Sequence, residues 1–176
     1  ERTEDGWGEP AVVEDLSTAG QNEAPLNISA DGNTFILFMS GDLGFSQKTP
    51  DGWSEPELFP SAINLGDWQA DASITADGKA MLFVHGDGVD RNDIYLSFRQ
   101  ADGSWGPAQK LSDQVNTPDN ERTPFLHPDM KTLYFSSSGY GGLGNLDVYV
   151  STRIGDGWDD WTPPRNLGKE INTVGS

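Results

Sequence analysis

A segment that occurs three times constrains the fold of this chain more than any other feature of the sequence. The best-preserved copy runs from Glu121 to Arg153, and the other two begin at Glu23 and Gln69. Each copy reaches a turn eight residues after its first residue, then an apolar strand, then a later strand that starts at an aspartate. In the best-preserved copy the expected strands cover residues 123–126, 132–136 and 147–152. Short strands separated by Gly, Pro, Asn and Asp predict an all-β fold.

The turns and the segments between the copies also repeat. Asp-Gly pairs at residues 31–32 and 77–78 predict two-residue hairpin turns, because glycine adopts positive φ at no steric cost. Between the copies lies a tryptophan followed within three residues by proline, and it occurs at Trp7, Trp53, Trp105 and Trp161. The four equivalent tryptophans should pack between the outer strand and its neighbour. The repeat length of roughly 46–56 residues is typical of propeller blades.

Three four-stranded antiparallel blades are therefore expected, since stacking such sheets around an axis buries both faces of each sheet. The expected division is an outer strand at 7–13, blades at 23–59, 69–111 and 121–167, and a tail at 168–176. Closed propellers have about 4–8 blades, so three blades are too few for a ring. The chain, which begins at Glu1, is therefore expected to be a piece of a longer protein, or two copies close a six-bladed ring.

The charge of the chain excludes several classes of partner. The formal net charge is -17, with 28 acidic and 11 basic residues. Nucleic-acid binding is not expected, because phosphate contacts need clustered Lys and Arg, and an anionic membrane surface is disfavoured for the same reason. The chain has no cysteine, which excludes disulfides and thiolate metal sites. No apolar run approaches the length that spans a membrane, so direct membrane insertion is not expected either.

The copies resemble WD40-like β-propeller repeats of the TolB type. In the third copy the resemblance rests on Glu121, Pro124, Pro128, Asp129, Lys131, Leu133, Tyr134, Phe135 and Ser136, and continues through Gly141, Gly142, Asp147, Val148, Tyr149 and Ser151. The departures are Met130 for Gly, His127 for Ser and Gly44 for Tyr. The Gly-rich loop is most similar to propellers of cell-envelope lipoproteins with an OmpA-type tail. The resemblance implies a non-catalytic scaffold that binds a protein partner in the periplasm or at the cell surface of a bacterium.

Candidate binding residues lie where the copies differ. The loop from Gly86 to Asp93 carries Asp87, Asp90 and Asp93, a set of oxygen ligands that Ca²⁺ could use, although the spacing is not that of an EF-hand. Trp68 and Trp158 lie outside the repeated tryptophan position, and His127 precedes the turn of the third copy, where the family pattern has serine. We expect these three residues to contact a ligand or a partner. Apart from calcium, no cofactor is expected.

No catalytic residue is assigned, because neither a Ser/His/Asp arrangement nor a phosphate-binding loop can be placed. A carbohydrate-binding or glycosidase-like propeller is the alternative from another functional class. It would need carboxylates from different blades that converge on the axis, and the inner-strand candidates are Glu23, Asp71 and Glu121. A third alternative is an excised or engineered half-propeller that oligomerises to close the ring.

Overall fold

The computed structural model describes residues 2–3, 6–9, 12–16 and 22–174, and three antiparallel sheets make up most of it. The first sheet contains β3 (Glu23–Ile28), β4 (Thr34–Met39), β5 (Asp42–Thr49), β6 (Gly52–Trp53) and β7 (Glu57–Leu58). The second contains β8 (Trp68–Ile74), β9 (Ala80–Gly86), β10 (Asn92–Phe98) and β11 (Gln109–Lys110). The third contains β12 (Glu121–Leu126), β13 (Thr132–Ser137), β14 (Asp147–Thr152) and β15 (Arg165–Asn166).

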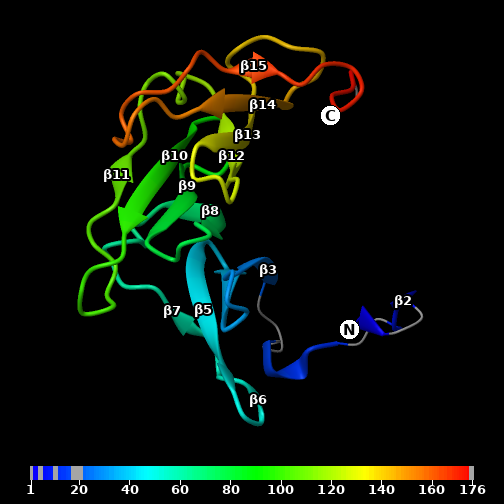
Figure 1. The fold of residues 1–176 in the computed structure, drawn as a ribbon, viewed down its shortest axis with the longest axis vertical. Coiled ribbons are helices and arrows are strands. Elements are labelled where there is room, and N and C mark those ends of the chain that lie inside the picture. Colours follow the sequence, from blue (N-terminus) through cyan, green and yellow to red (C-terminus); the bar gives the residue numbers. More distant parts are fainter. Residues whose placement is uncertain (1, 4–5, 10–11, 17–21, 175–176) are drawn as a thin grey trace.

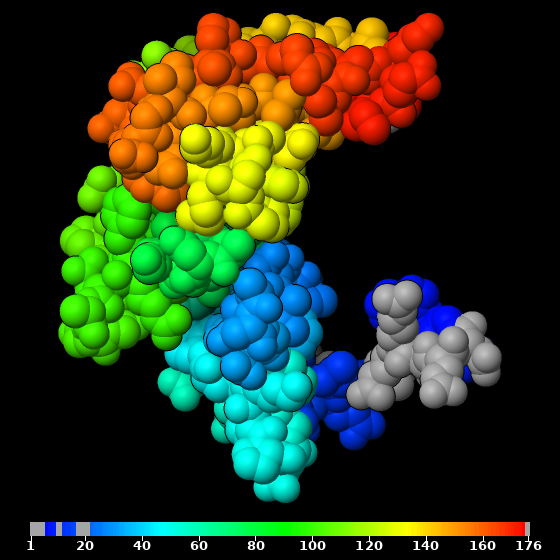
Figure 2. Space-filling model, viewed as in Figure 1, coloured from blue at the N-terminus to red at the C-terminus, as the bar shows by residue number. Residues whose placement is uncertain are grey.

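Each sheet is a meander in which three long strands pair in chain order and a two-residue strand completes the outer edge. The three sheets follow one another along an arc, with the C-terminal sheet at one end and the first sheet at the other (Figures 1 and 2). The strands expected from the repeats are present in all three copies, and β12, β13 and β14 end within two residues of the ends predicted for the third copy. The all-β fold of propeller blades is thereby confirmed.

Two hydrophobic clusters hold neighbouring blades together. One includes Ile36, Leu43 and Phe59 of the first blade with Met81 and Phe83 of the second. The other includes Ala80 and Leu82 of the second blade with buried residues of the third. Successive residues of β9 therefore face opposite neighbours, as the twofold side-chain period of a strand requires. This sharing explains why residues 80–84 form an uninterrupted apolar run instead of an alternating one.

The hairpin turns are longer than predicted. In the first blade, residues 29–33 separate β3 from β4, and the amide of Gly32 donates to the carbonyl of Ser29 at 2.8 Å. The Asp31 carboxylate accepts from the amide of Asn33 at 3.1 Å. Equivalent bonds join Asp77 to the Lys79 amide at 3.1 Å and Asp129 to the Lys131 amide at 2.8 Å. The prediction of two-residue turns is wrong because the aspartate side chain caps a larger loop.

Met130 adopts positive φ, 62°, at the position that Gly32 and Gly78 hold in the other blades. Left-handed backbone is unusual for a residue with a side chain. The Met130 side chain packs against the hydrophobic cluster between the second and third blades. That packing accounts for a methionine where the repeat pattern has glycine.

The tryptophan motif lies just before the outermost strand of each blade. A buried serine on the third strand donates to the backbone of this motif: Ser46 to Ser54 O at 2.7 Å, Ser97 to Gly106 O at 2.6 Å and Ser151 to Thr162 O at 2.6 Å. The four tryptophans differ in environment, because Trp161 is 1% exposed and Trp7 is 83% exposed. Trp7 belongs to β2 (Gly6–Trp7), which pairs with β1 (Arg2–Thr3). Residues 10 and 11 of the expected outer strand 7–13 lie outside the described residues.

Besides the strands, the described residues contain a 3-10 helix, Glu14–Leu16. Within the described part of the chain, no helix has the length and apolar character needed to cross a membrane.

Candidate functional site

The first strands of the three blades form the concave side of the arc. β3 contacts β8, and β8 contacts β12, so the three inner strands lie next to one another in chain order (Figure 1). Each inner strand has a bulge in its pairing with the second strand of its blade: between Pro25 and Asn27, between Ala70 and Ser73, and between Arg122 and Phe125. Bulges concentrate next to binding and active sites, because they redirect side chains away from a regular ladder.

Two of these bulges contain residues in the left-handed conformation. Asp71 has φ of 49° and Thr123 has φ of 51°, and the two occupy the same position in neighbouring copies. Positive φ in a β-branched residue is a true outlier and costs on the order of 1–3 kcal/mol. The inner strands thus carry backbone strain at one repeated position.

Trp68, Asp71 and Arg122 form what we call the inner-rim cluster, and it joins the second blade to the third. The Arg122 Nε donates to Asp71 Oδ2 at 2.6 Å, and the two side chains are 24% and 16% exposed. The guanidinium carbon of Arg122 lies 4.6 Å from the centre of the Trp68 ring. Trp68 also reaches the first blade, since its ring centre is 6.2 Å from that of Phe38. Of the predicted contact residues, Trp68 therefore lies where all three blades meet.

A pocket of about 250 Å³, which we call the inner-rim pocket, adjoins this cluster, and all three inner strands line it. Its lining includes Leu26 and Asn27 of the first blade, Asp71 of the second and Phe125 of the third. Asn27 Oδ1 is buried and has no hydrogen-bond partner within the described part of the chain. Phe125 is 45% exposed. The inner rim thus offers an unpaired acceptor beside an exposed aromatic ring.

Glu121 is a buried carboxylate with a structural set of partners. Its oxygens accept from the Thr117 amide at 2.8 Å, the Thr117 hydroxyl at 2.8 Å and the Ser137 hydroxyl at 2.6 Å. The side chain is fully buried, and burial raises the pKa of Glu121 above 4.5 despite these bonds. Burial likewise raises the pKa of the nearby Tyr140 hydroxyl.

A carbohydrate-active site would need the inner-strand carboxylates Glu23, Asp71 and Glu121, and two of these have different hydrogen-bond and ion-pair partners. Asp71 is ion-paired with Arg122, and Glu121 is enclosed by Thr117 and Ser137. Of the three candidates, Asp71 alone lines the inner-rim pocket, and Glu23 and Glu121 do not. The geometry lends no support to a carboxylate pair that flanks a glycosidic bond.

Two of the predicted calcium ligands, Asp87 and Asp93, make contacts within the loop and at the edge of the blade. Asp87 Oδ1 accepts from the amides of Val89, Asp90 and Arg91 at 2.9–3.2 Å, and these bonds hold the pKa of Asp87 below its ordinary value. Asp93 pairs with Lys110 at 2.9 Å, so Asp87 and Asp93 have separate partners. Across residues 2–3, 6–9, 12–16 and 22–174, no group of three or more His, Asp or Glu is arranged to hold a metal ion. The geometry gives no support to the calcium hypothesis.

The remaining two predicted contact residues lie away from the inner rim. His127 is exposed at the β12–β13 turn, where its Nδ1 lies 3.2 Å from Asp129 Oδ2. Trp158 packs between the second and third blades, with its ring 5.8 Å from Phe98 and 6.3 Å from Trp161. The structure does not bring His127 and Trp158 together with Trp68 in one described pocket.

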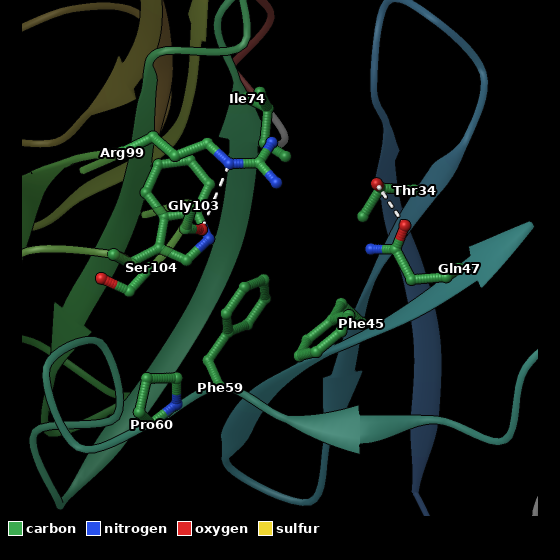
Figure 3. A pocket seen from close by; sticks show the side chains of 10 residues that line it. Thr34, Phe45, Gln47, Phe59, Pro60, Ile74, Arg99, Gly103 and Ser104 are labelled. Atoms are coloured by element: carbon green, nitrogen blue, oxygen red, sulfur yellow. Dashed lines mark hydrogen bonds between the residues drawn. The ribbon is translucent and has the colours of Figure 1, made fainter. Parts of the chain in front are cut away.

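A second concavity, which we call the interblade pocket, lies between the first and second blades and has a volume of about 220 Å³ (Figure 3). Its apolar walls are Phe45, Phe59, Ile74 and Trp105, and its polar margin includes Gln47 and Arg99. The Phe45 and Phe59 rings lie 4.9 Å apart and tilted. The Arg99 guanidinium carbon is 5.9 Å from the centre of the Trp105 ring, and its Nε donates to the Gly103 carbonyl at 3.3 Å.

Sequence reasoning missed Arg122 and the interblade pocket. Arg122 belongs to no motif of the third copy. Its partner Asp71 lies 51 positions earlier in the chain, so no local sequence pattern links the two residues. The pocket had a readable signal, because the second copy has Ser104 alone before its repeated tryptophan where the third copy has Trp158-Asp159-Asp160.

Comparison with known proteins gives a likeness of fold. No protein-family model matches the sequence, and no curated protein matches it. Among solved structures, TolB from Acinetobacter baumannii matches with a TM-score of 0.50 and 21% identity over 79% of this chain. A putative TolB from Agrobacterium tumefaciens matches with a TM-score of 0.40 and 18% identity over 78% of this chain. The chain spans 31% and 60% of these two proteins, respectively. The repeats thus form β-propeller blades with the fold of a TolB-like propeller.

Proposed function

We propose that this chain is a non-catalytic, protein-binding segment of a β-propeller in the bacterial cell envelope, and that its partner docks on the inner rim. The observation that carries the proposal is the inner-rim cluster: an arginine and a tryptophan from different blades stack beside an open pocket. Tryptophan and arginine are enriched among the residues that dominate the energy of protein interfaces. The unpaired Asn27 oxygen and the exposed Phe125 ring add one polar and one apolar contact for a partner.

The strained bulges favour binding over a purely structural role for this surface. Strain at Asp71 and Thr123 recurs at one position of two blades, on the strands that face the concave side. Strained residues cluster at binding and switch sites, where the surrounding structure holds them in place. Against an enzyme, Glu121 is enclosed and Asp71 is neutralised by its ion pair. The envelope location rests on the resemblance of the repeats to propellers of envelope lipoproteins and on the TolB-like fold.

Site-specific photo-crosslinking tests the proposal. A photoreactive amino acid would replace Thr123 at the inner rim or, as a control, Glu57 on the outer strand β7; both positions are exposed. Exposed to the envelope fraction of the bacterium that carries the gene, the variant labelled at position 123 should yield a discrete protein adduct, and the variant labelled at 57 should not. Light scattering on the purified chain separates a foreign partner from a second copy that completes a ring.

Arg122→Gln and Trp68→Ala should abolish this adduct. Arg91→Gln is the matched control, because Arg91 is exposed and its side chain lies on the acidic loop. The proposal fails if labelling is equal at positions 123 and 57, or if Arg122→Gln leaves the adduct unchanged while the fold is intact. Turnover in a panel of glycoside substrates, together with binding on a glycan array, would instead support the carbohydrate-active alternative.

A further inference from the structure

The interblade pocket has a filled counterpart one blade further along the chain. Arg99, Gly103 and Trp105 correspond to Arg153, Gly157 and Trp161 in the next copy. Where the second copy has Ser104 alone between Gly103 and Trp105, the third copy has Trp158-Asp159-Asp160. Gln47 on the wall of the pocket likewise corresponds to Phe98. The two interfaces thus share a frame and differ in the side chains that fill it.

In the filled interface the Trp158 ring supplies the missing volume. It packs edge-on against Phe98 at 5.8 Å and lies 6.3 Å from Trp161, which is 1% exposed. The Arg153 guanidinium covers the Trp158 ring at 4.7 Å and donates to the Met130 carbonyl at 2.8 Å. Trp105, by contrast, is only partly buried. The interface between the second and third blades therefore shows how these shared residues hold an aromatic ring, Trp158, beneath an arginine, Arg153.

The size and chemistry of the interblade pocket match such a ring. An apolar cavity of about 150 Å³ binds benzene in another protein. The volume of about 220 Å³ here leaves room for an indole. Figure 3 shows Phe45 and Phe59 on its walls and Arg99 at its margin. A guanidinium over an aromatic face contributes about 0.5–2 kcal/mol in structures of this kind.

Charge next to the pocket indicates what should flank the ring. A groove that shares Thr34, Ile74 and Arg99 with the pocket leads to Asp31 and Asp77. Hydrogen bonds from Ser29 and Asn33 lower the pKa of Asp31. Bonds from Thr75 and Lys79 lower the pKa of Asp77 in the same way, against the opposing effect of burial. Both groups are therefore ionised at neutral pH, on a chain of net charge -17.

We infer that the interblade pocket binds one aromatic side chain, a tryptophan or tyrosine, from a basic segment of a partner protein. The ring lies against the walls formed by Phe45, Phe59 and Trp105, beside Arg99. A neighbouring lysine or arginine of the partner faces Asp31 and Asp77. A second copy of this chain is the less suitable occupant, because its exposed Trp7 is followed by Glu9 and preceded by Glu4 and Asp5. The pocket shares no lining residue with the inner-rim pocket, so the inference stands apart from the function proposed above.

Titration of the ¹⁵N-labelled chain with short peptides tests the inference by NMR. The probe carries one tryptophan flanked by lysines; the comparison peptides replace the tryptophan with alanine or the lysines with glutamates. The first peptide should shift the Trp105 indole N–H and the Ile74 amide, and both comparison peptides should bind at least about tenfold more weakly. Absence of these shifts at millimolar peptide, or equal binding of the alanine peptide, would overturn the inference.

Filling the pocket from within gives the sharpest variant. Ser104→Trp adds an indole to a residue that lines the pocket, so this variant should melt at a higher temperature and lose binding of the tryptophan peptide. Ala101→Trp is the matched control, because it adds the same ring at an exposed position of the same loop. Equal peptide binding by the wild type and Ser104→Trp would contradict the inference. Self-association that disappears in Trp7→Ala would assign the pocket to a second copy instead.

Discussion

The side chain of Asn116 hydrogen-bonds to both the amide and the carbonyl of Ile94, as a neighbouring strand residue would. Its Oδ1 accepts from the Ile94 amide at 2.7 Å, and its Nδ2 donates to the Ile94 carbonyl at 3.0 Å. The same amide group donates to the Leu111 carbonyl at 2.9 Å. The other blades repeat this arrangement, with Asn64 on Leu43 and Asn172 on Val148. The repeated asparagine therefore ties the segment after each outer strand to the third strand of its own blade.

Replacing Asn116 by alanine should destabilise the protein by about 2–4 kcal/mol, because it leaves the buried Ile94 amide and Leu111 carbonyl without their partner at about 1–3 kcal/mol each. Urea unfolding followed by fluorescence measures the loss. Asn145→Ala is the control, since Asn145 is exposed, and it should change the free energy of unfolding by less than about 0.5 kcal/mol. Equal stability of the two variants would contradict a clamping role for Asn116.

Gly44→Ala should also be destabilising, by about 1–3 kcal/mol. A Cβ at Gly44 would meet the Met39 sulfur and would lie 2.9 Å from the carbonyl oxygen of Glu57, which belongs to the paired strand β7. The second copy has Tyr95 at this position, and that ring packs edge-on against His85, the counterpart of Met39. Thermal unfolding checks the loss. Gly157→Ala is the control, because nothing lies within 4 Å of the Cβ it would add.

Glu121 should make the stability of the protein depend on pH in a defined direction. Because burial raises its pKa above 4.5, the folded state binds a proton at this site more tightly than the unfolded state does. The stability from this proton is present below pH 4.5 and is lost as the pH rises through the raised pKa of the folded state. Glu121→Gln, which copies Gln69 of the second blade, should lack this dependence.

Urea unfolding of both proteins between about pH 4 and pH 8 measures the effect of Glu121. The wild type should lose stability relative to Glu121→Gln over the lower part of this range, and the difference should then level off. Glu57→Gln, at an exposed position, controls for the general effect of removing a negative charge. Parallel curves for wild type and Glu121→Gln would show that the site does not bind a proton more tightly in the folded state.

The parts of the fold that the sequence predicts correctly are those set by neighbouring residues. The strands follow from short apolar runs between turn residues, and the continuous run at 80–84 follows from burial of β9 against two neighbours. The turn type was wrong because the Asp31 side chain, rather than the Asp-Gly pair alone, determines the loop. The Asp71–Arg122 contact could not be predicted, because it depends on how two blades stack.

In the candidate site, too, the sequence indicates individual residues but not the contacts that depend on how the blades stack. Trp68 was singled out for lying outside the repeated tryptophan position, but its stacking on Arg122 is visible only in three dimensions. Trp158 was singled out by the same argument, and the structure places it in the interface between two blades. A residue that departs from the repeat therefore marks either a surface contact or a local change of packing, and the sequence alone does not separate the two.

Thr123→Gly should raise the free energy of unfolding by about 0.5–1.5 kcal/mol, although glycine in a strand is ordinarily destabilising. Thr123 has φ of 51°, a conformation that glycine adopts without strain, and its side chain is exposed. The lost hydrogen bond, between Thr123 Oγ1 and Ser136 Oγ at 2.8 Å, is solvent-exposed and contributes little. Ser136→Gly is the matched control: it removes the same hydroxyl pair at a residue without positive φ and should lower stability. Urea unfolding compares the two, and a loss of stability in Thr123→Gly as large as that in Ser136→Gly would show that the bulge stores no strain.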